Sequence, residues 1–116
     1  MDVWARAHSH TLQVREATHG FPRTGFASLK KQITTAAESV AFNIVEGCGS
    51  SSNPDFARFL QISIKSAYEL EYQLLLARDY GVLMESEWQS LSAETIEIRR
   101  MLCGLRKKVI DSHKAT

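Results

Sequence analysis

Apolar side chains recur at alternating spacings of three and four residues in four stretches of the chain, a period typical of amphipathic helices. The last stretch is the most regular and places on one face Trp88, Leu91, Thr95, Ile98, Leu102, Leu105 and Val109. Ser86 and Gln89 can form a capping box before this face. The sustained seven-residue repeat favours a gentle left-handed supercoil. We expect a helix over about residues 86–110.

The third stretch has the strongest start signal in the sequence. Asn53 suits the N-cap, and Pro54 suits the first helical position, where its missing N–H has no intrahelical partner. Gly81 is a suitable stop, so we expect a helix over about residues 54–79. Its core face consists of Phe56, Leu60, Ser63, Ala67, Leu70, Leu74 and Ala77.

This third helix carries a second apolar row, formed by Ile64, Tyr68, Tyr72 and Leu75. The row lies roughly 100° around the helix from the core face. A helix that is apolar over so wide an arc has more apolar surface than three companion helices can cover. We therefore expect a homo-oligomer whose interface includes this row. Glu71 and Arg78 lie between the two rows and could pair with each other or across that interface, or they could form a snorkelling pair at its rim.

The second stretch, about residues 28–46, places on one face Leu29, Ile33, Ala36, Val40 and Ile44. Asn43 falls on the same face, and a buried amide needs hydrogen-bond partners, so we expect it to bond across the bundle. Phe42 and Val45 point elsewhere, which indicates a place in the interface. The weakest helical pattern, about residues 2–18, carries Val3, Ala7, Val14 and Ala17, with Trp4 on the flank.

Short connections between these helices favour antiparallel packing of sequential helices. The predicted fold is all-α: an antiparallel up-down-up-down four-helix bundle, with residues 1–116 as one domain. No apolar stretch approaches the roughly 20 residues of a membrane span, and the first ten residues lack a signal-peptide core. We therefore expect a cytoplasmic protein without a membrane partner.

Charge is segregated along the chain, although the net charge is only +1. Residues 36–97 carry three basic and ten acidic side chains, a net −7, whereas residues 98–116 carry six basic and one acidic, a net +5. The basic segment includes Arg99, Arg100, Arg106, Lys107 and Lys108. These side chains can attract the phosphates of RNA or DNA without reading base sequence, or they can be a solvated helix end. No aromatic residue lies among them to stack a base, so binding by one subunit should be weak.

No complete catalytic constellation is visible in the sequence. A di-metal site in a four-helix bundle needs two Glu-x-x-His pairs and two further glutamates, whereas this chain has one pair, Glu16 and His19. The two cysteines, Cys48 and Cys103, have neither metal-ligand spacing nor a disulfide framework. We expect a non-enzymatic protein without a cofactor or metal. A small-molecule or metal-binding helical-bundle enzyme is the alternative.

Five segments occur in a recognisable order: VWARAH, THGFPRTGFASLKKQ, SVAFNIVEG, FARFLQISIKSAYELEYQLLLARDYG and RMLCGL. Together they resemble the four-helix bundle family encoded in intervening sequences of bacterial 23S ribosomal RNA genes, over residues 3 to about 109. The resemblance implies a non-enzymatic homopentameric scaffold. A related branch, the accessory variability determinant of diversity-generating retroelements, binds nucleic acid and a reverse transcriptase. The resemblance therefore implies RNA, DNA or another protein as partners.

Two polar elements carry part of this resemblance. Asn43, Glu46 and Gly47 match an Asn-Ile-x-Glu-Gly element, and Glu69 lies in a Ser-Ala-x-Glu-Leu-Glu element. The resemblance implies architectural roles for these polar side chains within or between bundles, and Glu46 and Gly47 are expected to end the second helix. The chain departs from the family at Thr34-Thr35, Gly49-Ser50 and Ala41. The first two departures lose basic residues and so reduce the charge available to nucleic acid.

Overall fold

The computed structural model describes residues 1–115, and all the regular secondary structure in them is helical. The four helices are α1 (Asp2–Thr18), α2 (Ala27–Cys48), α3 (Asn53–Asp79) and α4 (Glu85–Ala115). They form an elongated body of 53 × 21 × 19 Å. The predicted all-α fold class is confirmed.

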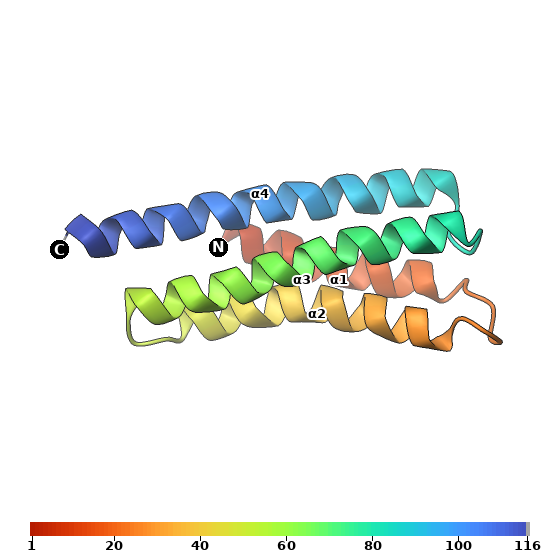
Figure 1. The fold of residues 1–116 in the computed structure, drawn as a ribbon, viewed down its shortest axis with the longest axis horizontal. Coiled ribbons are helices and arrows are strands. Elements are labelled where there is room, and N and C mark those ends of the chain that lie inside the picture. Colours follow the sequence, from red (N-terminus) through yellow and green to blue (C-terminus); the bar gives the residue numbers. More distant parts are fainter. Residues whose placement is uncertain (116) are drawn as a thin grey trace.

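The helices pack side by side along the long axis (Figure 1). α3 lies against α2 and α4, and α1 lies against the same two helices, so helices that are neighbours in sequence are neighbours in space. The α1–α2 and α3–α4 connections lie at one end of the body and the α2–α3 connection lies at the other (Figure 1). The last turns of α4 extend beyond the first residue of α1 (Figure 1).

The core runs the length of the bundle in two adjoining clusters. The cluster nearer the α2–α3 connection includes Val3, Ala7, Ile44, Leu60, Ile98 and Leu102. The other cluster includes Val14, Ile33, Leu70, Leu74 and Leu91. These residues come from the apolar faces that the three-and-four spacing defines, because only such a spacing keeps side chains on one side of a helix. None of the four helices has the combination of length and apolar character that crossing a membrane requires.

Helix ends differ from the predictions in three places. Ser52, not Asn53, caps α3: its backbone is extended, and its hydroxyl accepts a hydrogen bond from the Asp55 N–H at 3.3 Å. α2 continues through Gly47 to Cys48, and its end is satisfied by a bond from the Gly49 N–H to the Val45 carbonyl at 3.1 Å. α4 continues past the expected end to Ala115. Its last turn contains the basic residue Lys114, whose positive charge interacts favourably with the negative end of the helix dipole.

Candidate interaction surfaces

An ion pair between Arg99 on α4 and Glu71 on α3 joins the two helices. The Arg99 Nε donates to Glu71 Oε2 at 2.6 Å and Nη2 donates to Oε1 at 3.4 Å. The guanidinium also lies over the Tyr68 ring, 4.4 Å from its centroid. Hydrogen bonding to Glu71 raises the pKa of Arg99. Arg99 is thus engaged within the subunit, and it does not belong with the cations that are free to bind phosphate.

Glu71 and Arg78 do not pair with each other within the subunit, which was one of the alternatives that the sequence left open. Residues seven apart share a helix face but are separated by about 10 Å along the axis, too far for an ion pair without strong bending of both side chains. Arg78 instead donates to Asp79 Oδ1 at 3.0 and 2.9 Å and lies 4.2 Å from the centroid of the Trp88 ring. It also approaches Glu85, with 3.8 Å between Nε and Oε2.

Replacing Arg99 with Ala should lower the free energy of unfolding by about 1 kcal/mol, because it leaves the Glu71 carboxylate, whose side chain is only 22% exposed, without its partner. Urea unfolding measures this change. The control is Arg100→Ala on the exposed side of the same helix, which should change the free energy by less than about 0.5 kcal/mol. Equal effects of the two substitutions would contradict a stabilising role for the pair.

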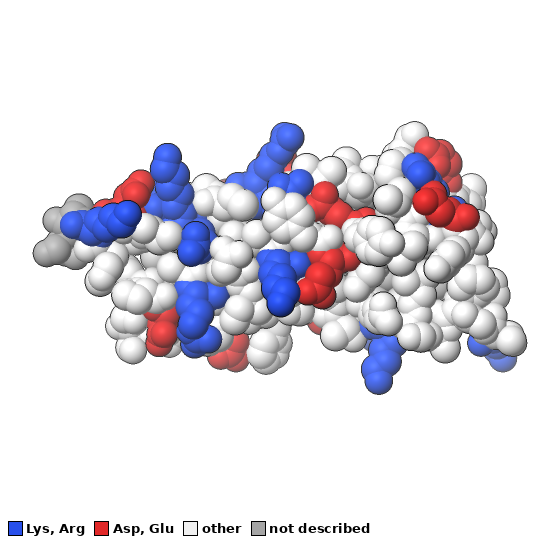
Figure 2. Space-filling model, in the orientation of Figure 1, with Lys and Arg blue, Asp and Glu red and all other residues white. Residues whose placement is uncertain are grey.

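The other predicted basic residues lie on the outside of α4. Arg100, Lys107 and Lys108 are exposed, whereas Arg106 is half-buried and its Nε is enclosed without a hydrogen-bond partner. Figure 2 shows Lys and Arg side chains gathered over the C-terminal half of α4 and the neighbouring start of α3, with acidic side chains more prominent towards the middle and upper right. The accessible basic surface therefore consists of Arg100, Lys107 and Lys108, with Arg106 at its edge.

The predicted apolar row of α3 divides into a buried and an exposed part. Ile64 is only 5% exposed, so the expectation that it lies in an oligomer interface is wrong: it points towards the corner that α3 and α4 share and packs in the core. Leu75 is half-buried. Tyr68 and Tyr72 are 54% and 61% exposed, and we call these two residues the tyrosine ridge.

A second exposed apolar feature lies on α2. Phe42 and Val45 are 65% and 52% exposed on the outer side of the helix, as the sequence pattern predicts. The tyrosine ridge and this α2 patch come from different helices. The subunit thus presents exposed apolar side chains on two neighbouring helices.

A polar cluster links α2 to α3. Asn43 Nδ2 donates to the Ser39 carbonyl at 2.8 Å and to Ser39 Oγ at 3.0 Å. Ser39 Oγ lies 2.8 Å from Ser66 Oγ on α3. The prediction that Asn43 bonds directly across the bundle is therefore wrong, because half-buried Asn43 lies at the edge of its face and reaches α3 through Ser39. The Ser63 hydroxyl makes a second direct link between the two helices by donating to the Val40 carbonyl at 2.7 Å.

Beside this cluster, a shallow groove of about 490 Å³ runs between α2 and α3. We call it the α2–α3 groove, and its lining includes Lys31, Thr35, Ala36, Ser66, Glu69 and Gln73. Gln73 Oε1 is buried without a hydrogen-bond partner. Glu69 and Glu46 are exposed, and neither carboxylate makes a hydrogen bond or an ion pair with another residue among residues 1–115. The polar elements noted in the sequence thus leave unpaired acceptors along this side of the subunit.

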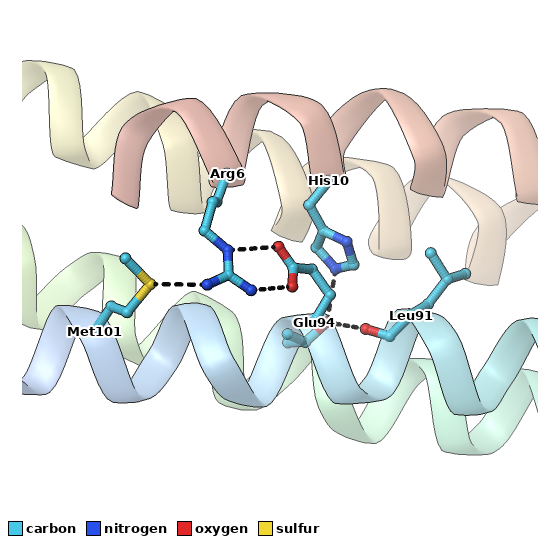
Figure 3. Close-up of polar contacts among 6 residues, drawn as sticks. Arg6, His10, Leu91, Glu94 and Met101 are labelled. Atoms are coloured by element: carbon cyan, nitrogen blue, oxygen red, sulfur yellow. Dashed lines mark hydrogen bonds and ion pairs between the residues drawn. The ribbon is translucent and has the colours of Figure 1, made fainter. Parts of the chain in front are cut away.

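A buried histidine, which sequence reasoning missed, lies inside the bundle (Figure 3). His10 is 3% exposed, and its Nε2 lies 2.7 Å from Thr95 Oγ1. The Thr95 hydroxyl donates to the Leu91 carbonyl at 2.7 Å, so it accepts from His10, which places the ring proton on Nε2. Nδ1 is then an acceptor, and it is buried without a partner. Burial lowers the pKa of His10 to about 4.

The position of His10 in the sequence could have revealed its burial. It lies three residues after Ala7 and four before Val14, both core residues, so it continues their face of α1. Beside it, on the rim of the bundle, Arg6 Nε donates to Glu94 Oε2 at 3.0 Å and Arg6 Nη1 to Met101 Sδ at 3.5 Å (Figure 3). These contacts fix α1 against α4.

The residues considered for metal or nucleophilic chemistry do not come together. In the part of the chain that the structure describes, no three His, Cys, Asp or Glu side chains gather where they could hold a metal ion. Glu16 and His19 are exposed at the end of α1. Cys48 and Cys103 are free, exposed thiols on different helices.

These observations define a small all-α protein, a four-helix bundle with aromatic, basic and polar surface features. The sequence matches the family described as 23S rRNA-intervening sequence protein over residues 1–104, and the chain belongs to this family. The family resemblance read from the sequence is therefore confirmed.

One solved structure shows a similar fold. It is a crystal structure of a protein with unknown function from the S23 ribosomal protein family from Bacteroides thetaiotaomicron. The TM-score is 0.82 at 24% sequence identity, and the similarity covers 90% of this chain and 98% of that one. No curated protein matches this sequence. The likeness supports the fold and says nothing further about activity.

Proposed function

We propose that residues 1–116 form one antiparallel up-down-up-down bundle that acts as a cytoplasmic, non-enzymatic scaffold and assembles into a homopentamer. The observation that carries the proposal is the exposure of Tyr68 and Tyr72 on α3 together with Phe42 and Val45 on α2. Aromatic side chains bury about 150–250 Å² each and dominate interface energetics. Soluble monomers rarely leave such apolar features grouped on their surface, and an interface would cover them.

Light scattering coupled to size exclusion tests the assembly directly. The expected mass is five times that of the chain, the number that the family resemblance implies, and it should not depend on dilution over the micromolar range. A protein that elutes as a monomer at every concentration would overturn the scaffold proposal. A different closed oligomer would correct the number of subunits while keeping the interface.

A narrower function is contact with RNA or DNA through the accessible basic surface. Arg100, Lys107 and Lys108 can attract phosphates by releasing condensed counterions, and this attraction does not depend on base sequence. Repetition of the surface around an oligomer would raise the avidity of an otherwise weak contact. Tyr68 of the neighbouring helix α3 lies under Arg99, so an aromatic residue adjoins the basic segment although none occurs within it.

Filter binding of a structured RNA over a series of salt concentrations tests this narrower function. The affinity should fall steeply with salt, and the double substitution Lys107→Glu and Lys108→Glu should abolish binding because it replaces attraction by repulsion. The matched control reverses two exposed cations at the other end of the bundle, Arg15→Glu and Arg23→Glu, and should retain most of the affinity. No binding by the unmodified protein at low salt would rule out this function and leave the scaffold proposal intact.

A further inference from the structure

We propose that the α2–α3 groove of one copy receives the tyrosine ridge of a second copy, so that the subunits join head to tail. This inference rests on the homo-oligomer proposed above and names the two surfaces that meet. The ridge consists of Tyr68 and Tyr72. The groove is the hollow that includes Thr35, Ser66 and Gln73.

The tyrosine ridge has the form of a rigid projecting surface. The Tyr68 ring is held from one side by the Arg99 guanidinium, which is itself held by Glu71. Tyr72 lies one helical turn further along α3 and is 61% exposed. Within residues 1–115 the Tyr72 hydroxyl makes no hydrogen bond. Because Tyr68 is already held in place, it loses little conformational freedom on binding. The Tyr72 hydroxyl remains available to donate a hydrogen bond to a partner.

The α2–α3 groove is complementary to this ridge in shape and in hydrogen bonding. Small side chains, Thr35, Ala36 and Ser66, line it, which allows a bulky side chain from outside to approach the helix backbones closely. Gln73 Oε1 is buried there without a partner, an arrangement that disfavours the isolated subunit. A tyrosine hydroxyl can supply the one donor that the Gln73 carbonyl lacks.

The charges around the two surfaces are also complementary. Glu38 and Glu46 are exposed on α2, the helix that forms one wall of the groove. Lys65 precedes Tyr68 by one helical turn, and Arg100 follows Arg99 on the exposed side of α4. The groove itself carries one charge of each sign, Lys31 and Glu69, so the exposed acidic residues of α2 and the basic residues near the ridge complement each other only around the rim of the contact. Such an arrangement favours contact between the ridge of one copy and the groove of another, and it disfavours contact between two ridges or between two grooves.

The direction of the two surfaces favours a closed assembly. Tyr72 and Gln73 are consecutive on α3, so their side chains point about 100° apart around the helix. A subunit with two different contact surfaces must associate heterologously, and such contacts build a ring when the rotation between neighbours closes. Each subunit then uses its ridge for one neighbour and its groove for the other.

Two single substitutions separate the surfaces. Thr35→Arg places a bulky side chain in the groove, and Tyr72→Arg removes one of the two tyrosines of the ridge. Both positions are exposed, so neither substitution replaces a core residue. Each variant alone should lose the oligomer and behave as a monomer in light scattering. An equimolar mixture should form one-to-one dimers of twice the monomer mass, because one intact groove and one intact ridge remain. Leu12→Arg, at a 56% exposed position of α1, is the control and should keep the unmodified mass.

The outcomes distinguish this inference from the scaffold proposal. If the unmodified protein is an oligomer and both variants remain oligomers of the same size, the named surfaces are wrong while the scaffold stands. If both variants are monomers and their mixture stays monomeric, the head-to-tail arrangement is wrong. Circular dichroism spectra should coincide for all four proteins, which shows that a change in mass does not come from unfolding.

Discussion

Acidification from about pH 7 to about pH 4 should lower the free energy of unfolding by on the order of 3 kcal/mol through His10 alone. The pKa of His10 in the folded protein is lowered from 6.5 to about 4. Between these two values the unfolded chain binds a proton that the folded chain does not. The stabilisation is therefore fully present above about pH 6.5 and is lost as the pH falls towards 4.

The cause lies in what surrounds the imidazole. Most of the small cavity beside it is lined by apolar side chains of α1–α4, among them Ala37, Ala67 and Leu70. Protonation would place an N–H on Nδ1, which has no acceptor, and would place a charge in this apolar setting. The Glu94 carboxylate raises the pKa slightly but is already engaged by Arg6, so it only partly offsets the burial.

Urea unfolding at pH values between 4 and 7 measures this effect. The contribution of titrating carboxylates is the same in the unmodified protein and in histidine variants, so the difference between them isolates the contribution of His10. His10→Gln should be less stable at neutral pH, since it leaves the site without a well-fitted ring, but it should lose the part of the pH dependence that His10 provides. His8→Gln, at an exposed position on the same helix, should retain the full dependence. An unchanged pH dependence in His10→Gln would show that His10 does not carry it.

The fold could be predicted from the sequence because one physical constraint dominates it. A helix that buries one side must place apolar residues at spacings of three and four, and most residues on α2, α3 and α4 that do so are buried. Leu29, Phe56, Trp88 and Leu105 are partly buried and pack against the core. Helix ends were less predictable, since Ser52 and Asn53 are both good caps. The choice between them depends on where the chain turns to enter α3.

The surface chemistry could be predicted only in part, because it depends on which helices are neighbours. The apolar arc of α3 that contains Ile64 would have the same sequence whether it faced α4 or another copy of the chain. Only the structure shows that Ile64 is covered, because it lies in a core cluster with Ile98 and Leu102 of α4. Arg99 belongs to a basic segment in sequence, but the α3–α4 register brings Glu71 to it. His10 was missed because a polar residue on a core face needs a partner from a distant helix, here Thr95.

Gly47 illustrates the same limit, since the family resemblance implied only that it ends the second helix. The structure places it inside the last turn of α2, buried where that helix meets the first turns of α3. A Cβ at this position would lie 2.8 Å from Phe56 Cδ1 and 3.2 Å from Phe59 Cβ. The second contact involves an atom close to the backbone, which a side-chain rotation cannot move away.

Gly47→Val should therefore lower the free energy of unfolding by about 2–3 kcal/mol, because α2 and α3 must separate to admit the side chain. The loss should occur although valine has a somewhat better helix propensity than glycine. Gly104→Val on α4 is the matched control, since a Cβ there meets nothing within 4 Å, and its stability should stay the same or rise by a few tenths of a kcal/mol. Urea unfolding of both variants measures the difference. If the two substitutions had the same effect on the free energy of unfolding, helix propensity would decide the outcome. The close approach of α2 to α3 would then not explain why position 47 is glycine.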